Sequence, residues 1–218
     1  DTVNARLYVD TDQLDNGKTY IYTIRAVNGG TLSSYDTRGL SYHYLDTPRL
    51  LAAANGPVGV TVRWSAVDGA EKYAVYRRIP GGAWSRIQTT GKTTNYVDTT
   101  AVSGTQYEYT VRAGTDAYLS GYVADGIAVR YLSAPVLRSV VEESGGIRVS
   151  WDAVSGAQTY RIYRKTTGGW QQMAIISASH TSWMDTGATE TGTVYTYTVR
   201  ASAGGLSGYD SKGLSIQR

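Results

Sequence analysis

The sequence predicts an all-β fold of tandem β-sandwiches, and two observations lead to that prediction. Short segments alternate apolar with polar residues, with the period of two that a half-buried strand requires, and Gly, Ser and Asp separate them. In residues 146–165, two such segments are joined by turn residues at 152–156. The same pattern stands at 59–78, where Trp64 occupies the position that Trp151 occupies 87 residues later. A repeated β module therefore organises the chain.

An aromatic strand marks three copies of this module. The segment Tyr-x-Tyr-Thr-(Ile/Val)-Arg-Ala begins at Tyr20, Tyr107 and Tyr195, and a short extended segment with an Asp-Thr pair precedes each copy. A Gly/Ser-rich turn, a further Tyr and a last strand follow each copy. Alternation places both aromatic side chains of the motif on one face, which we expect to point inward.

The Trp-bearing first half of the module occurs only twice, and this sets the expected domain boundaries. We expect a partial module at 1–46, followed by complete modules at 47–132 and 133–218. The linkers between them, 46–47 and 133–134, are very short. Neighbouring modules should therefore be restrained relative to one another.

Composition limits the class of protein. The 218 residues carry a formal charge of +3, with Lys and Arg scattered among acidic residues, which argues against a nucleic-acid groove. No apolar run approaches the ~20 residues that span a membrane as a helix. The chain has no Cys, which excludes a zinc ribbon, a thiol nucleophile and a disulfide, and fits either a reducing cytoplasm or an exported protein.

These landmarks resemble fibronectin type III domains. The residues that carry the resemblance are the Trp of the second strand, the Tyr-x-(Ile/Val)-Tyr third strand, and the Gly-Thr-x-Tyr-x-Tyr-Thr-Val-Arg-Ala sixth strand. The chain is most similar to the bacterial form found in tandem on surface proteins and within polysaccharide-degrading enzymes. The resemblance implies a seven-stranded sandwich in which strands A, B and E face C, C′, F and G. Residues 1–46 then correspond to strands E, F and G.

The expected structural core consists of large aromatic side chains. We expect Trp64 and Trp151 to fill the space between the sheets, because the chain has no Phe and only Tyr and Trp supply aromatic burial. The other expected core residues are all tyrosines: Tyr73, Tyr160, Tyr20, Tyr107 and Tyr195. The resemblance further implies that the last three are corner tyrosines, whose hydroxyls bond the backbone of the preceding loop.

Candidate catalytic and metal-binding residues are few. The acidic loop at 10–17 faintly resembles a calcium loop, but Leu14 stands where a ligand is needed, no Glu closes the loop, and the other copies lose the acids. The two histidines, His43 and His180, fall at non-equivalent positions, and Glu142 and Glu143 are adjacent in a loop, where their side chains point apart. We therefore expect no catalytic residue, no metal and no cofactor.

Trp84 and Trp170 are the candidate ligand surface. Each follows a Gly-Gly turn and begins the segment equated with strand C′. Exposed aromatic rings on a sandwich can stack on sugars, so a carbohydrate-binding or adhesive surface is one hypothesis. The other is that both side chains cover apolar surface at the sheet edge, which their equivalent module positions favour. The two hypotheses differ in whether the rings are solvent-exposed and coplanar.

The partial module raises a question of its own. Its apolar face, Tyr20, Tyr22 and Ile24, would have no opposing sheet, and an isolated strand pair is marginal in water. An upstream segment, a proteolytic or expression boundary, or completion by another chain would each explain it. The favoured hypothesis is a piece of a longer protein whose front half is absent or supplied by a separate chain.

The function expected from these observations is that of a non-catalytic spacer or interaction segment. It would belong to a large exported bacterial protein, secreted or at the cell surface, and would position neighbouring domains. The alternatives are a carbohydrate-binding or adhesive module, and an accessory segment of a polysaccharide-degrading enzyme. The expected partners are neighbouring domains, another chain that completes 1–46, and a polysaccharide, with no nucleic acid and no membrane span.

Overall fold

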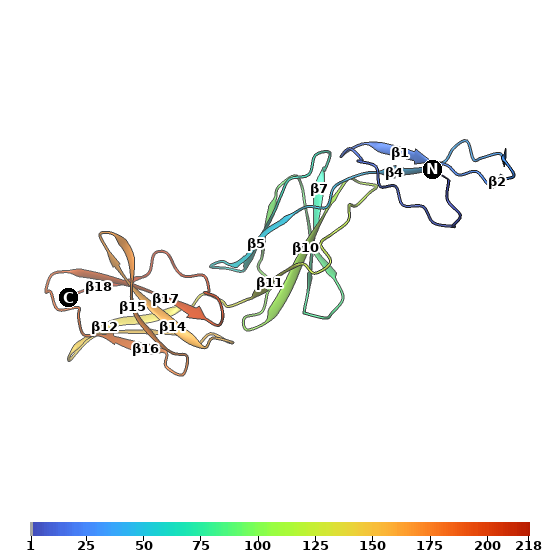
Figure 1. Cartoon of the computed structure of the whole chain (residues 1–218). Coiled ribbons are helices and arrows are strands. Elements are labelled where there is room, and N and C mark those ends of the chain that lie inside the picture. The colour runs from blue at the N-terminus through green and yellow to red at the C-terminus, as the bar shows by residue number, and fades with distance from the viewer. Residues whose placement is uncertain (1) are drawn as a thin grey trace.

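The computed structural model describes residues 2–218, and all the regular structure in this range is β-strand. The strands form successive units that follow one another along an elongated molecule (Figure 1). Between residues 2 and 218 there is no helix long and apolar enough to cross a membrane.

The middle unit consists of two antiparallel sheets. One sheet has the order β5-β6-β9, formed by Leu50–Asn55, Val60–Trp64 and Asn95–Asp98. The other has the order β11-β10-β7-β8, formed by Ile127–Arg130, Gln106–Gly114, Lys72–Arg78 and Ser85–Thr90. This arrangement places strands A, B and E opposite G, F, C and C′, which is the topology that the resemblance implies.

The C-terminal unit repeats this topology. Its first sheet has the order β12-β13-β16, formed by Leu137–Glu143, Gly146–Trp151 and Ser182–Asp185. Its second sheet has the order β15-β14-β17-β18, formed by Gly169–Ser177, Thr159–Thr166, Val194–Ser202 and Leu214–Gln217. The two strands expected within 146–165 therefore belong to opposite sheets. Glu142 and Glu143, expected in a loop, end β12.

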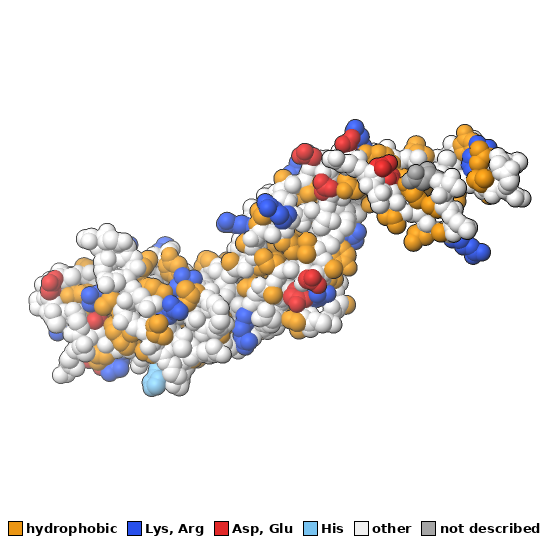
Figure 2. Space-filling model, in the orientation of Figure 1, with side chains coloured by type: hydrophobic (Ala, Val, Ile, Leu, Met, Phe, Trp, Pro, Cys, Tyr) orange, Lys and Arg blue, Asp and Glu red, His pale blue; other side chains and the backbone are white. Residues whose placement is uncertain are grey.

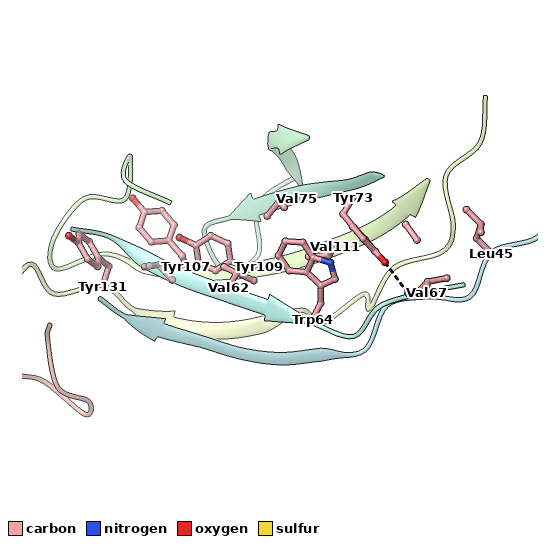
Figure 3. Close-up of a cluster of buried hydrophobic side chains, with 12 residues drawn as sticks. Leu45, Val62, Trp64, Val67, Tyr73, Val75, Tyr107, Tyr109, Val111 and Tyr131 are labelled. Carbon is pink, nitrogen blue, oxygen red and sulfur yellow. Dashed lines mark hydrogen bonds between the residues drawn. The ribbon is translucent and has the colours of Figure 1, made fainter. Parts of the chain in front are cut away.

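Alternation along β6 produces one wall of the core. Val60, Val62 and Trp64 are buried, whereas Thr61 and Arg63 between them are more exposed. The Trp64 ring lies 5.6 Å from the Tyr73 ring of the facing sheet, and the Val67 backbone N–H donates to the Tyr73 hydroxyl (Figure 3). This bond gives the polar end of a buried tyrosine a partner.

The same arrangement recurs 87 residues later. The Trp151 and Tyr160 rings lie 5.3 Å apart, and the Val154 N–H donates to the Tyr160 hydroxyl over 2.7 Å. Tyr107 and Tyr195 are also buried in their respective cores. Each complete module thus has its own aromatic core.

The residue before each linker belongs to the core of the module that follows. Leu45 is buried in the cluster around Trp64 (Figure 3), and Leu132 is buried in the cluster around Trp151. The sequence-based boundaries at 46/47 and 132/133 place these leucines at the ends of the preceding modules. Structurally, both side chains extend the following core to the junction.

The partial module forms fewer strands than expected. Strands β1 and β4, Thr19–Tyr22 and Leu40–His43, pair as F and G, and a small hairpin follows β1 as β2 and β3, Val27–Asn28 and Thr31–Leu32. The expected strand E, around Tyr8, is not a strand. In complete modules strand E pairs only with strand B, and residues 2–46 supply no such strand. Tyr20, an expected core residue, is only half-buried.

Candidate functional site

The corner tyrosines occupy equivalent positions in all three copies. The Tyr20 hydroxyl accepts a hydrogen bond from the Asp15 N–H over 2.8 Å. Tyr107 and Tyr195 accept from the N–H groups of Val102 and Glu190 over 3.2 and 3.1 Å. Each bond ties the loop that enters strand F to the strand itself, so these tyrosines are engaged inside the fold.

A buried ionic cluster joins the two sheets of the middle module. Asp98, at the end of β9, has no exposed surface. It accepts from the Tyr109 hydroxyl over 2.8 Å and from Arg77 Nη1 over 2.6 Å. The Thr100 backbone N–H and hydroxyl donate to its other oxygen. Asp98 lies in the A-B-E sheet, whereas Arg77 and Tyr109 lie in the facing sheet, so the cluster closes the sandwich across its core.

The cluster changes the acidity of its members. Burial alone would raise the pKa of Asp98, but hydrogen bonds from Thr100, Tyr109 and Arg77 hold this pKa below its ordinary value. Burial, followed by the hydrogen bond to Asp98, raises the pKa of Tyr109. The cluster therefore holds a charged carboxylate and a neutral tyrosine at physiological pH.

The C-terminal module carries the same cluster, and the partial module carries only part of it. Asp185 accepts from the Tyr197 hydroxyl and from Arg164 Nη1, each over 2.8 Å. In the partial module the Tyr22 hydroxyl donates to Asp10 over 2.8 Å, and this bond raises the pKa of Tyr22 to about 12. No arginine among residues 2–218 contacts Asp10. The recurring Asp-Thr pairs are visible in the sequence, but the sequence analysis did not predict that their Asp is a buried partner of Tyr and Arg. The Arg that recurs on strand C, Arg77 and Arg164, is the signal that could have indicated this pairing.

Trp84 lies in a stack of side chains on the outer face of the four-stranded sheet. The Arg78 guanidinium lies 4.2 Å from the centre of the Trp84 ring and pairs with Glu108 over 2.6 Å. The edge of Trp84 lies against Gly126, where a Cβ would stand 2.7 Å from the ring. Tyr122 meets Trp84 edge-on at 6.4 Å. A shallow hollow of about 190 Å³ beside the stack is lined by Tyr76, Trp84, Thr110, Arg112 and Tyr122.

The corresponding stack of the C-terminal module is built from equivalent positions. Lys165 lies 6.0 Å from the centre of the Trp170 ring, Tyr209 meets that ring edge-on, and the ring lies against Gly213. Trp84 and Trp170 are both half-buried. Each ring is engaged by a cation, an aromatic edge and backbone, which leaves less of it for stacking on a sugar.

The remaining chemical candidates are not brought together. Asp10, from the acidic loop, bonds Tyr22 and the Asp12 N–H. The His43 ring stacks on the Tyr118 ring of the next module, with 5.5 Å between their centres. His180 lies in the C-terminal module. In residues 2–218, no group of three His, Cys, Asp or Glu side chains is arranged to hold a metal ion.

Glu142 and Glu143 are engaged by arginines. Glu142 pairs with Arg218 over 3.0 Å, and Glu143 pairs with Arg148 over 2.8 Å. The two carboxylates therefore bind separate cations and do not face each other.

The junctions between modules are repeated structures. At the first, the backbone of Gly69 approaches Gly17 so closely that a Cβ on Gly69 would stand 2.5 Å from the Gly17 Cα. At the second, Gly156 and Gly104 meet in the same way. All four glycines have positive φ. Thus the same two loops of successive modules touch, backbone against backbone, at both junctions.

Hydrogen bonds reinforce the second junction. The Ser103 hydroxyl donates to the Ser155 carbonyl over 3.0 Å, and Asn55 Nδ2 donates to the Leu206 carbonyl over 3.2 Å. The backbone of Gly56 and Pro57 lies directly against Gly208. A hollow of about 380 Å³ remains between these modules.

Comparison with known proteins relates the chain to bacterial enzymes. No family model matches it. It is 30% identical to Exoglucanase B of Cellulomonas fimi over 92% of this chain and 20% of that protein. It is 30% identical to an amylopullulanase of Thermoanaerobacterium saccharolyticum over 45% of this chain and 8% of that protein. It is 32% identical to a poly(3-hydroxybutyrate) depolymerase of Ralstonia pickettii over 52% of this chain and 21% of that protein. The chain thus spans about a fifth or less of the length of these curated relatives.

Solved structures of similar fold include tandem fibronectin domains. The FN1–FN3 domains of chicken CNTN1 are 18% identical over 93% of this chain and 77% of that one, with a TM-score of 0.33. A segment of two fibronectin type III domains from chicken tenascin is 16% identical over 79% of this chain and 100% of that one, with a TM-score of 0.40. The strand order of both complete modules defines the class: this chain is a tandem array of fibronectin type III-type β-sandwiches.

Proposed function

We propose that this chain is a non-catalytic spacer within a larger exported bacterial protein that acts on polysaccharide. It would hold neighbouring domains at a fixed reach and orientation. The observation that carries the proposal is the repeated junction, because a spacer transmits position only if its modules cannot move independently. Linkers between independent domains are usually flexible and make few contacts.

Three restraints act at the second junction. Leu132 is buried in the core of the C-terminal module, so the linker cannot swing without exposing it. The Gly104–Gly156 contact leaves no room for the loops to slide toward each other. The bonds of Ser103 and Asn55 fix the rotation of one module against the other. Together these contacts support a junction with one preferred geometry.

The relatives support the kind of protein to which the spacer belongs. Exoglucanase B and the amylopullulanase are named for action on glucans, and this chain corresponds to a small part of each. An accessory position in such an enzyme, and an extracellular location, follow as parts of the proposal. The partners would be the neighbouring domains of the same protein.

The polar groups buried inside the modules also support a structural role. Asp98 and Asp185 are each paired with an arginine and a tyrosine of their own module. A catalytic carboxylate must be able to reach a substrate, whereas these two face the interior between the sheets. These two carboxylates therefore hold the two sheets of their modules together.

A double-label distance measurement on the full chain tests the proposal. Because the chain has no Cys, the substitutions Lys92→Cys and Lys212→Cys provide the only labelling sites, both on exposed loops of successive modules. We expect a narrow distribution of distances between the spin labels. Inserting a flexible Gly/Ser segment between Leu132 and Ser133 should broaden it. Equally broad distributions with and without the insertion would show that the junction is flexible and would overturn the spacer proposal.

A further inference from the structure

The hollow at the second junction has walls from two modules. One wall is the turn between β5 and β6, residues 55–57, and the other carries Arg200, Tyr209, Asp210 and Ser211 of the C-terminal module. Its volume of about 380 Å³ falls within the range of about 300–1,000 Å³ that small-molecule pockets have. Such pockets form preferentially between domains. The hollow is therefore a candidate binding site that the spacer function does not use.

Arg200 is fixed on one side of the hollow. Its Nε and Nη2 atoms donate to the Ser207 carbonyl over 2.9 and 2.7 Å, and its guanidinium lies 5.2 Å from the centre of the Tyr209 ring. Its Nη1 atom donates to no protein group within residues 2–218. A guanidinium only donates hydrogen bonds, so a ligand acceptor would meet a donor that needs no rearrangement.

Asp210 supplies the opposite hydrogen-bonding character. One of its carboxylate oxygens accepts the Lys212 backbone N–H over 2.9 Å, which orients the group, and the other accepts from no protein group in the described part of the chain. An ionised carboxylate only accepts hydrogen bonds. Val123 stands at the corresponding position of the middle module. The fold itself therefore does not require a carboxylate here.

These groups together define the chemistry of the ligand. A hydroxyl both donates and accepts hydrogen bonds, so hydroxyls can pair with Arg200 and with Asp210. Tyr209 and Pro57 add apolar surface from the two walls, which suits the C–H groups of a sugar ring. An anion would be repelled by the carboxylate and a cation by the guanidinium, which favours a neutral ligand. Figure 2 shows basic and acidic side chains scattered over the visible surface, with no large patch of one sign to attract a polyelectrolyte.

We propose that this hollow binds a short segment of a neutral glucan chain. Hydroxyls of the glucan would accept from Arg200 Nη1 and donate to the second carboxylate oxygen of Asp210. The inference rests on the proposed function, because the hollow keeps its shape only if the junction is fixed, and because the choice of a glucan follows relatives named for action on glucans. A spacer with this site would also hold the polymer close to the neighbouring domains.

Titration of the full chain with maltohexaose and with cellohexaose, followed by amide NMR, tests the proposal. The two probes distinguish α-linked from β-linked glucans. We expect saturable shifts of amides on both walls, at 55–58 and 207–211, with at least one probe. Hexagalacturonic acid, an anionic probe of the same length, should give none, because it would meet Asp210. No saturable shift with either glucan up to about 10 mM, shifts confined to one wall, or equal binding of the anionic probe would overturn the proposal.

Two substitutions with the same change of charge make the result specific. Asp210→Asn keeps an oxygen that can accept the Lys212 N–H but replaces the other with an amide donor, so the affinity for the glucan should fall about tenfold. Asp125→Asn, on the corresponding exposed loop of the middle module, is the matched control and should leave the affinity unchanged. An equal loss of affinity in both variants would contradict the assigned role of Asp210 and overturn the site.

Spin labels introduced by Lys92→Cys and Thr167→Cys separate failure of the site from failure of the spacer. Neither position lines the hollow. A narrow distance distribution without glucan binding would overturn the site and leave the spacer proposal standing. A broad distribution that the glucan narrows would overturn the fixed spacer and support the site. A broad distribution that the glucan does not change would overturn both.

Discussion

The Tyr109 hydroxyl donates a 2.8 Å hydrogen bond to Asp98 across the interior of the middle module, and neither residue is exposed to solvent. Arg77 completes the arrangement from the neighbouring strand of the same sheet as Tyr109. A buried carboxylate is tolerated only when its charge and its lone pairs are satisfied. The cluster therefore makes the closed sandwich the one arrangement in which all three groups have partners.

Removing the arginine should destabilise the middle module strongly. Arg77→Met keeps the alkyl part of the side chain but leaves Asp98 buried without its cation, and such changes cost about 3–5 kcal/mol. The measurement is urea unfolding of the full chain, followed by hydrogen exchange in peptides from 47–132 and from 133–218. Only the first set should lose protection.

Lys72→Met is the matched control for this substitution. Lys72 lies on the same strand as Arg77, but its partner Asp116 is exposed. Breaking an exposed ion pair changes stability little. A similar loss of stability in both variants would show that strand C is sensitive to any substitution and that the buried pair is not special.

High pH should weaken both complete modules. Burial raises the pKa of Tyr109 and of Tyr197, so the fold favours their neutral forms. Their contribution is fully present below about pH 10, where tyrosine titrates in unfolded chains, and is lost as the pH rises further. Each tyrosine should then lower the free energy of unfolding by up to about 1.4 kcal/mol per pH unit. Unfolding midpoints between pH 8 and 12 measure this, and Tyr109→Phe should flatten the decline in the middle module alone.

The fold was largely predictable because its signals are local and repeated. Alternation around Trp64 and Trp151 gives strands with one apolar face, and the recurrence of Tyr107 and Tyr195 gives the module length. The strand topology followed from the resemblance, and the structure has that topology. The expected strand at Tyr8 failed to form because a strand needs a neighbour, which local pattern does not guarantee.

The features that sequence reasoning missed depend on contacts between distant residues. Arg77 and Asp98 are separated along the chain and lie in opposite sheets, and an Asp followed by Thr is also typical of a turn. Leu132 stands at a module boundary, where its side chain could have belonged to either core. The cation above Trp84 comes from the adjoining strand β7 and is not marked by any spacing. In each case packing decided the role.

Replacing the outer-face tryptophan should reduce stability. Trp84→Ala removes the ring that Arg78 covers and that lies against Gly126. Loss of the cation–π contact, the aromatic edge contact and the half-buried area should together cost about 2 kcal/mol. Urea unfolding of the full chain, followed by hydrogen exchange in peptides from 47–132, measures the change in stability.

The same variant distinguishes a structural tryptophan from a sugar-binding one. A surface ring that serves only a ligand can be removed with a change in stability within about 0.5 kcal/mol. Affinity electrophoresis in soluble glucans provides the second readout. Retarded migration of the unaltered chain, lost in Trp84→Ala without a loss of stability, would favour the carbohydrate-binding hypothesis over the structural one.

Crowding the second junction should loosen the array without unfolding it. Gly156 and Gly192 both have a φ of 82°, so an alanine at either position imposes a similar backbone strain of about 1–2 kcal/mol. Their surroundings differ: a Cβ at Gly156 would meet the backbone of Gly104, whereas a Cβ at Gly192 has no atom within 4 Å. Gly156→Ala should therefore displace one module against the other, and Gly192→Ala should not.

The spin-labelled pair at Lys92 and Lys212 reports this difference directly. We expect Gly156→Ala to shift or broaden the distance distribution, and Gly192→Ala to leave it as in the unaltered chain, although both variants lose stability through backbone strain. Comparing the two variants separates crowding of the junction from strain within a loop. If both variants leave the distribution unchanged, the Gly104–Gly156 contact does not set the module orientation, and the buried Leu132 and the bonds of Ser103 must do so alone.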